Sequence, residues 1–269
     1  MSAIHYHETL WSAVLPGNTH TSHCLQDAVL ASETALDLAP KRRSRVVWRV
    51  DGGGGSDRHI RFLLNRGYHL MIKGSSNRRA EALARQVKRW DDYRDVQLGS
   101  VAAPVDYGRR VQVVVKRRQD KDGQHRHSYY LSTLRQPSKG ALMRLYDDRG
   151  GAEVEQFRSD KSGLALAVRR KQRLIAQGAL VQLTDLAHNL LADFQRHVLV
   201  DTPLQNWGAK RIVRDLLAMP GHLIFEGSQL KCIQLNAAHP HAKCLVEHLP
   251  KLLEANRNPL HLQEDAAQE

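Results

Sequence analysis

RVVWRVDGGGGSDRHIRFLLNRGYHLMIKG, residues 45–74, holds two short apolar runs separated by glycines and a helical pattern. The β-branched and aromatic run at 45–51 predicts a strand, and residues 68–72 predict a second one. Between them, IRFLLNRG has helical periodicity, with Asp57 as the expected N-cap and Gly67 at the end. This strand–helix–strand order indicates an α/β domain.

Asp51 is the last residue of the first predicted strand, and Gly52–Gly55 follow it directly. Open α/β sheets place their sites beyond the carboxyl ends of strands, where an acid can meet a ligand. The glycines let a phosphate or a metal ion approach the backbone closely. An ordinary Asp-Gly turn and a flexible linker are the alternatives. Because strand and helix patterns abut the glycines on both sides, the linker is the less favoured interpretation, and Asp51 is a candidate site residue.

The residue patterns elsewhere in the chain predict further helices and strands. Helical periodicity covers 21–37 and 78–90, whereas 3–15 alternates weakly, as a strand does. The β-rich middle, with turns at Gly108 and Gly123, is expected to form a small antiparallel subdomain inserted into the core. The remaining expected elements are strands at 94–101, 110–117 and 127–133, a helix from about Ala141, a long helix at 165–197, a helix at 208–218, a hairpin turning at 227–228 and a last helix at 241–254.

A second stretch, YDDRGGAEVEQFRSDK, carries Tyr146, Arg149, Glu153 and Lys161 at helical intervals. The first three residues are spaced by three and four, so they share one face of a helix. An ordinary salt-bridged surface helix has the same spacing. The rival carboxylate Glu155 lies nearly opposite Glu153, so only one of the two can face a site.

Two glycines, Gly150 and Gly151, interrupt this stretch. Glycine weakens a helix interior, so the pair is expected to mark a helix start or a kink.

The charge balance points to a polyanionic partner. Lys and Arg total 40 against 28 Asp and Glu, which gives a formal charge of +12. Nucleic acid is the first candidate for such an excess. The clusters that could follow a duplex backbone are Lys41–Arg43, Arg78–Arg79, Lys116–Arg118 and Arg169–Lys171, and at least half of them are expected to be merely solvated polar faces.

Cys24, Cys232 and Cys244 are an odd number of cysteines without framework spacing, which indicates a reducing, cytoplasmic setting. No apolar run reaches membrane-spanning length and no signal peptide is evident, so no membrane partner is expected. Cys232, His239, His241 and Cys244 could instead hold a structural zinc ion, although their spacing matches no standard finger.

The chain resembles the insertion-sequence DDE transposases that have a Tyr–Arg–Glu–Lys signature. RVDGGGGSDRHIRFLLNRGYHLMIKG is similar to the family block around the second catalytic Asp, and LTDLAHNLLADF is similar to the segment after the Glu. The order of parts matches over about 45–195. Lys161 falls one place later than the family's lysine, because Asp160 occupies that position.

The resemblance implies an α/β fold: an RNase H-like catalytic core with an inserted antiparallel β subdomain and a C-terminal helical region. The expected division is a core from 1–93 and 137–200, an insertion at 94–136, a helix–hairpin–helix region at 201–260 and a disordered tail at 261–269.

The implied activity is metal-dependent cleavage and transfer of the DNA strands at transposon ends, in the bacterial cytoplasm at the nucleoid. Asp51 and Glu153 would be the catalytic, metal-binding acids of a two-Mg²⁺ site. Arg149 and Lys161 would hold DNA phosphates, and Tyr146 would position a phosphate or the Glu. The expected partners are double-stranded DNA, a second copy of the chain or a full-length transposase.

The family has a further catalytic Asp on the first core strand, and no residue here matches it. The acids upstream of Asp51 are Glu8, Asp27, Glu33 and Asp37, and the last three fall in a predicted helix. We therefore expect an N-terminally truncated form that binds DNA with little or no catalysis of its own.

Two other functions remain open at this stage. The chain could be a non-catalytic regulator or inhibitor of a full-length transposase. An unrelated RNase H-like nuclease is disfavoured by the Tyr–Arg–Glu motif and the β-rich middle.

Overall fold

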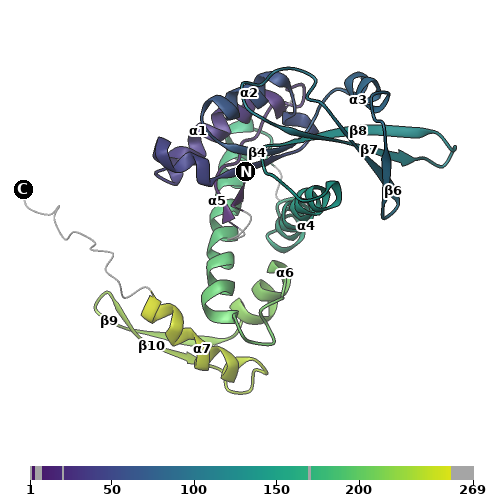
Figure 1. Ribbon diagram of the computed structural model, residues 1–269. Helices are drawn as coiled ribbons and strands as arrows, with labels where there is room; N and C mark the ends of the chain where they lie inside the picture. Colours follow the sequence, from purple (N-terminus) through teal and green to yellow (C-terminus); the bar gives the residue numbers. More distant parts are fainter. Residues whose placement is uncertain (1, 4–7, 20, 169–170, 256–269) are drawn as a thin grey trace, which may run out of the picture. The chain divides into compact units, whose positions relative to one another are not determined.

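The computed structural model describes residues 2–3, 8–19, 21–168 and 171–255, and the backbone alone at 2–3, 21, 149–157 and 250–255 (Figure 1). These residues form two compact units. Unit 1 contains residues 2–3 and 10–154, and unit 2 contains residues 8–9 and 155–255. The expected tail at 261–269 lies outside the described residues.

Unit 1 is built on a six-stranded mixed sheet with the strand order β3-β4-β8-β7-β6-β5. Only β3 and β4 are parallel, with Val47 opposite His69, and the other neighbours are antiparallel. The strands are β3 Val47–Val50, β4 His69–Lys73, β5 Trp90–Tyr93, β6 Val96–Val101, β7 Gln112–Gln119 and β8 His125–Ser132. The expected α/β class is therefore confirmed, with a mostly antiparallel sheet.

Helices cover both faces of this sheet, because successive side chains of a strand point to opposite sides. Leu70 and Ile72 of β4 pack on the face that carries α1, α2 and α3, whereas Met71 packs with Leu142 and Met143 of α4 on the other face (Figure 1). The helical segments are η1 Thr21–Cys24, α1 Leu25–Ala35, η2 Pro40–Arg45, η3 Gly52–Gly54, α2 Asp57–Asn65, α3 Asn77–Ala84 and α4 Lys139–Gly163. The central strands are therefore buried on both sides.

Several elements differ from the sequence-based expectation. Ser56, not Asp57, caps α2, because its hydroxyl accepts the His59 N–H at 3.4 Å. The helix expected at 78–90 ends at Ala84, and Trp90 already belongs to β5, because Trp90–Tyr93 pairs with β6. The strands of the expected insertion form no sheet of their own, since β8 pairs directly with β4.

The segment expected as one strand at 3–15 is not one. Strand structure is limited to β1 Ser2–Ala3 and β2 Glu8–Thr9, and residues 10–16 have no regular structure. An alternating pattern becomes a strand only where a neighbouring strand accepts its hydrogen bonds, and no strand pairs with 10–16 in the described chain.

Unit 2 is mainly helical. Its core contains Val198, Leu199, Ile212 and Leu216, all nearly inaccessible to solvent. Beside the end of α4, its elements are α5 Leu174–Phe194, η4 Gln195–Leu199, α6 Ala209–Ile212, η5 Val213–Leu217, the hairpin β9 Gly221–Glu226 with β10 Gln229–Leu235, and α7 Ala242–Ala255. None of the helices within the described ranges is long and apolar enough to cross a membrane.

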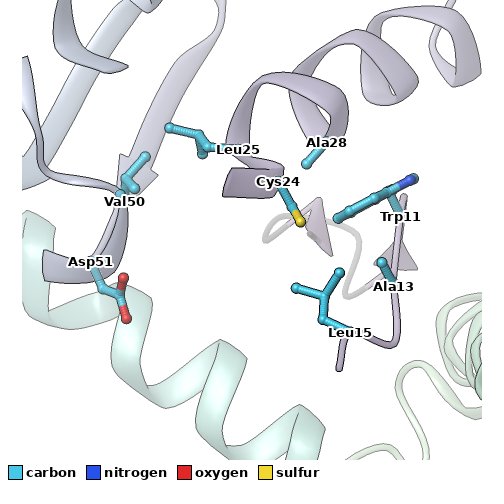
Figure 2. Close-up of a pocket in the computed structure, with 9 residues that line it drawn as sticks. Trp11, Ala13, Leu15, Cys24, Leu25, Ala28, Val50 and Asp51 are labelled. Carbon is cyan, nitrogen blue, oxygen red and sulfur yellow. The ribbon is translucent and has the colours of Figure 1, made fainter. Parts of the chain in front are cut away.

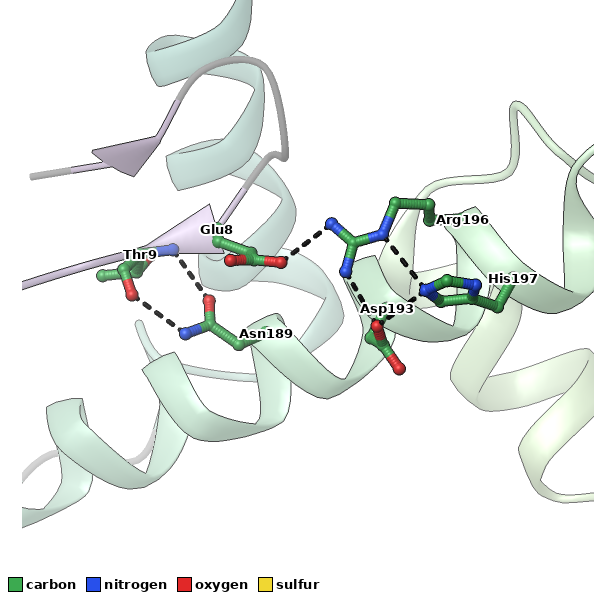
Figure 3. A network of polar contacts seen from close by, with 6 residues as sticks. All are labelled: Glu8, Thr9, Asn189, Asp193, Arg196 and His197. Carbon is green, nitrogen blue, oxygen red and sulfur yellow. Dashed lines mark hydrogen bonds and ion pairs between the residues drawn. The ribbon is translucent and has the colours of Figure 1, made fainter. Parts of the chain in front are cut away.

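Side chains of α5 and η4 hold the strand β2 (Figure 3). The Asn189 amide accepts the Thr9 N–H at 2.7 Å and donates to the Thr9 carbonyl at 2.9 Å. Arg196 binds the Glu8 carboxylate at 2.9 Å and Asp193 at 2.8 Å. The side-chain amide of Asn189 thus satisfies both backbone hydrogen-bonding groups of Thr9.

Glu33 of α1 is the centre of a polar cluster in unit 1. Its carboxylate accepts hydrogen bonds from Arg66 Nε at 2.8 Å, Arg43 at 3.0 Å and the Tyr68 hydroxyl at 2.5 Å. The side chain is only 10% exposed. Burial raises the pKa of this carboxyl, but the hydrogen bonds from Arg66 and Tyr68 outweigh burial and the net pKa is lowered. The cluster ties α1 to the end of α2 and the start of β4.

We predict that Glu33→Gln lowers the free energy of unfolding by about 2 kcal/mol at neutral pH, because two arginines lose their buried counter-charge. The contribution of the wild-type carboxylate is present above its ordinary pKa of 4.5 and is lost as the pH falls through the lower folded-state value. Urea unfolding of both proteins at neutral and acidic pH measures this difference, which should shrink in acid.

Glu247→Gln is the control, because Glu247 is exposed on α7 and should change stability by less than about 0.5 kcal/mol. Equal unfolding midpoints for the wild type and Glu33→Gln at neutral pH would contradict the role assigned to the cluster.

Candidate functional site

Asp51 follows β3 directly and begins a glycine loop. Its backbone is extended, and its carboxylate accepts the Gly53 N–H at 3.0 Å. The residue is exposed, and no ion pair engages its carboxylate in the part of the chain that the structure describes. Asp51 therefore presents an acid at the carboxyl end of a strand, as its position in the sequence predicts.

The glycine loop is an ordered part of the fold and not a flexible linker. A Cβ on Gly55 would lie 1.9 Å from the Lys73 carbonyl oxygen, so only glycine fits there. The Gly55 carbonyl also accepts the Ser75 N–H at 3.2 Å. The His59 ring bonds to the Gly54 carbonyl at 3.1 Å, and burial lowers the pKa of His59, which favours the neutral ring. The loop thus holds Asp51 in one place.

A cavity of about 230 Å³ adjoins Asp51 (Figure 2). Its walls are mostly apolar, and alternate residues of the segment before α1 form one of them. The other walls come from η1, α1 and the end of β3. The residues labelled in Figure 2 are Trp11, Ala13, Leu15, Cys24, Leu25, Ala28, Val50 and Asp51. The cavity leaves room beside the carboxylate for a side chain or for several waters.

Tyr146 joins α4 to the strand that carries Asp51. Its hydroxyl lies 3.5 Å from the Val50 carbonyl oxygen, a long hydrogen bond, and its ring meets Tyr130 edge-on at 4.8 Å. The side chain is only 6% exposed. This burial leaves little of the Tyr146 side chain accessible to a ligand.

The helix of the signature is continuous across its two glycines. α4 runs from Lys139 to Gly163, so Gly150 and Gly151 neither begin nor end it. Glu153 follows Tyr146 by two turns, about 10 Å along the axis, on the same side of the helix. The side chains of Arg149, Glu153 and Glu155 lie outside the described residues.

The last turns of α4 belong to unit 2, where Lys161 is exposed. Asp160, which stands where the family has its lysine, is buried and bonds to His188 Nδ1 of α5 at 2.7 Å. Asp160 therefore serves packing between α4 and α5.

Lys73 is a cation beside the Asp51 loop that the sequence patterns did not single out. It ends β4, and parallel pairing brings the carboxyl ends of β3 and β4 together. A Cβ on Gly52 would lie 3.7 Å from the Lys73 Cδ atom, so this side chain runs along the loop. The position of Lys73 at the end of the second predicted strand is the sequence feature that could have identified it as a candidate site residue.

Some cations of the basic clusters make contacts within the fold, and others are exposed without an ion pair to a described residue. Arg79 makes two bonds to Asp57 at 2.7 and 2.9 Å, and Arg117 stacks on Trp90 at 4.3 Å. Lys41, Arg42, Arg78 and Lys171 are exposed and make no ion pair with a described residue. Arg169 and Arg170 lie outside the described residues. A polyanion could therefore contact exposed cations of the clusters Lys41–Arg43, Arg78–Arg79 and Arg169–Lys171. In the cluster Lys116–Arg118, Arg118 instead pairs with Asp95 at 3.3 Å.

The structure does not bring the four candidate zinc ligands together. Cys232 is exposed on β10, whereas His239 and His241 stack with each other at 5.6 Å. No three His, Cys, Asp or Glu side chains with described positions come together as metal ligands.

Comparison with known proteins identifies the family. A family model described as transposase DDE domain group 1 matches residues 5–257, which is nearly the whole chain. A comparison with curated proteins gave no match. The match spans the Asp51 loop, α4 and unit 2 alike. This chain belongs to the DDE transposase family, in the group named transposase DDE domain group 1.

Proposed function

We propose that the chain binds duplex DNA at transposon ends of a bacterial insertion sequence and carries two metal-binding carboxylates of a polynucleotidyl-transfer site, Asp51 and Glu153. The observation that carries this proposal is the exposed Asp51 at the end of β3. The Tyr146 hydroxyl connects α4 to Val50, the residue before Asp51. The parallel strands β3 and β4, with α4 across the sheet, are compatible with an RNase H-like core.

The donor set suits Mg²⁺, which prefers carboxylate and phosphate oxygens. Asp51 supplies an exposed carboxylate on a loop whose glycines leave the approach open. Glu153 is proposed as the second ligand from its position on α4. In a two-metal site, the bound ions supply activation of the nucleophile and stabilisation of the leaving oxygen.

The remaining roles concern the DNA backbone. Lys73 would contact a phosphate beside the Asp51 loop, and Arg149 and Lys161 would contact phosphates from α4. Tyr146 would act indirectly, by holding α4 against the end of β3. Contacts of this kind give affinity without reading the sequence.

We propose further that the chain has little catalytic activity alone. Glu8, the upstream acid on a strand, is paired with Arg196 and is therefore a poor candidate for the further acid that the family requires. A DNA-binding chain with an incomplete site could act as a regulator that competes with a full-length transposase for the same ends, and this is the second candidate function.

We predict that the chain binds duplex DNA with a steep salt dependence, and that Lys73→Ala reduces the slope of log affinity against log salt by about 1. Fluorescence anisotropy with a labelled duplex that carries the flanking inverted repeats measures the slope. Lys243→Ala, a change at an exposed lysine of α7, is the control and should leave the slope unchanged. If the slope for Lys73→Ala equals that of the wild type, Lys73 does not contact the DNA backbone.

We predict that Mg²⁺ raises the melting temperature of the wild type and that Asp51→Asn abolishes this rise, because a ligand that binds only the folded state stabilises it. Without Mg²⁺ the variant should match the wild type within about 0.5 kcal/mol, since Asp51 is exposed. Thermal unfolding with and without Mg²⁺ tests this. An equal rise in both proteins would place the ion elsewhere.

We predict that the wild type cleaves and transfers DNA strands in Mg²⁺ or Mn²⁺ no faster than Glu153→Gln. The assay uses the same duplex and measures strand cleavage and strand transfer by gel. Activity in the wild type that is lost in Glu153→Gln and in Asp51→Asn would show that the site is complete and that the proposed inactivity is wrong. Glu8→Gln would then test whether Glu8 is the further acid.

A further inference from the structure

The cavity beside Asp51 is a feature that the proposed function leaves unexplained. Its lining residues all belong to unit 1, so its walls come from one compact unit. The cavity measures about 230 Å³. An apolar cavity of about 150 Å³ is enough to bind a benzene molecule. The space beside Asp51 therefore accommodates an organic ligand with one aromatic ring.

The walls of the cavity favour a ligand with an apolar body. Trp11 and Leu15 line it from the segment before α1, and Leu25, Ala28 and Val50 line it from α1 and β3 (Figure 2). The indole of Trp11 is a large aromatic surface against which a second ring can pack. Moving an aromatic ring from water into these surroundings removes its apolar surface from solvent, which stabilises the complex.

Asp51 gives the cavity its charge. Among the lining residues that the structure describes, it is the one charged side chain, in a chain with a formal charge of +12. Its carboxylate accepts the Gly53 N–H at 3.0 Å and makes no ion pair with a described residue. A carboxylate accepts several hydrogen bonds, so it has capacity for a cationic donor. It attracts a cation in the cavity and repels an anion.

The arrangement of these groups sets the shape of the ligand. Figure 2 shows Asp51 on one side of the space and Trp11 and Ala13 on the other. If a benzene-sized ring takes about 150 Å³, about 80 Å³ remains, which is the room that two or three small heavy groups need. An aromatic ring joined by two carbons to an ammonium group has this size.

We propose that this cavity is a binding site for a small organic cation, an arylalkyl amine whose ring lies among the apolar residues and whose ammonium group pairs with Asp51. A neutral apolar ligand would leave the carboxylate without a partner, and an anion would be repelled by it. Because the proposed metal site uses the same carboxylate, the amine and Mg²⁺ would exclude one another, and the cavity would be a site of inhibition.

The first test compares three ligands of nearly equal size that differ in charge. The probe is 2-phenylethylamine, which is protonated at neutral pH, and the comparators are the neutral 2-phenylethanol and the anionic 3-phenylpropionate. Binding to the full chain is measured by ligand-observed NMR titration without Mg²⁺, so that the result is independent of the proposed metal site. The amine should bind with a dissociation constant on the order of 1 mM.

The alcohol should bind roughly threefold to fivefold more weakly than the amine, because it lacks the ion pair with an exposed carboxylate. The anion should bind more weakly than the alcohol. Equal affinity for all three ligands would overturn the proposal, as would the absence of amine binding at 10-fold above the expected dissociation constant, about 10 mM.

The second test separates the charge of the cavity from its volume. Asp51→Asn should lower the affinity for the amine to that for the alcohol and leave the affinity for the alcohol unchanged. Asp27→Asn is the matched control, because Asp27 is an exposed acid of α1 that does not line the cavity. An equal loss of amine affinity in both variants would overturn the assignment to Asp51.

Ala28→Leu should fill the cavity and weaken binding of the amine and the alcohol alike, by roughly tenfold or more, because the added side chain takes the space of the ring. Ala13→Phe, from the opposite wall, should act in the same direction. Circular dichroism and thermal unfolding establish that each variant is folded. Unchanged affinity for the amine in folded Ala28→Leu and Ala13→Phe would place the ligand elsewhere and overturn the proposal.

The third test locates the ligand through the thiol in the cavity wall. Cys24 is half-buried and lines the cavity, whereas Cys232 is exposed on β10. A saturating concentration of 2-phenylethylamine should slow the reaction of Cys24 with methyl methanethiosulfonate severalfold and leave that of Cys232 unchanged. Mass spectrometry of peptides measures both rates. A rate at Cys24 that the amine does not alter would contradict binding in this cavity.

Discussion

The parallel pairing of β3 with β4 is the contact on which unit 1 depends. Two parallel strands cannot be joined by a tight turn, so the chain must cross over between them, and α2 is that crossover. Its Ile60 and Leu63 are completely buried against the sheet. The pairing also brings the carboxyl ends of both strands to one edge of the sheet. Lys73 therefore lies beside the Asp51 loop, although 22 positions of sequence separate Lys73 from Asp51.

The absence of side chains at the glycines completes this arrangement. The Gly55 Cα lies so close to the backbone at the end of β4 that no Cβ fits, and this contact closes the loop after Asp51. On the opposite face of the sheet, Tyr146 anchors α4 to Val50, one residue before Asp51. A strand end, a loop and a helix thus meet around one carboxylate, and the proposed metal chemistry requires this convergence.

The two units differ in the surface they offer. In addition to Lys73 at the Asp51 loop, unit 1 carries exposed cations such as Lys41, Arg42 and Arg78. These positive charges suit a phosphate backbone. In unit 2 the helix α5 lacks cations altogether and exposes leucines instead.

The sequence by itself determined β3, α2 and β4 and the position of Asp51 at a strand end, because local periodicity and glycines encode them. The continuity of α4 across Gly150 and Gly151 did not follow from the sequence, which indicated a helix start or a kink there. It also carried the family resemblance that the match over 5–257 confirmed. Only the tertiary structure decided that the β-rich middle joins the same sheet, that Trp90 starts a strand, that residues 10–16 form none, and that Lys73 lies along the Asp51 loop. These outcomes depend on which distant segment accepts a hydrogen bond or fills a contact, and no local pattern specifies that partner.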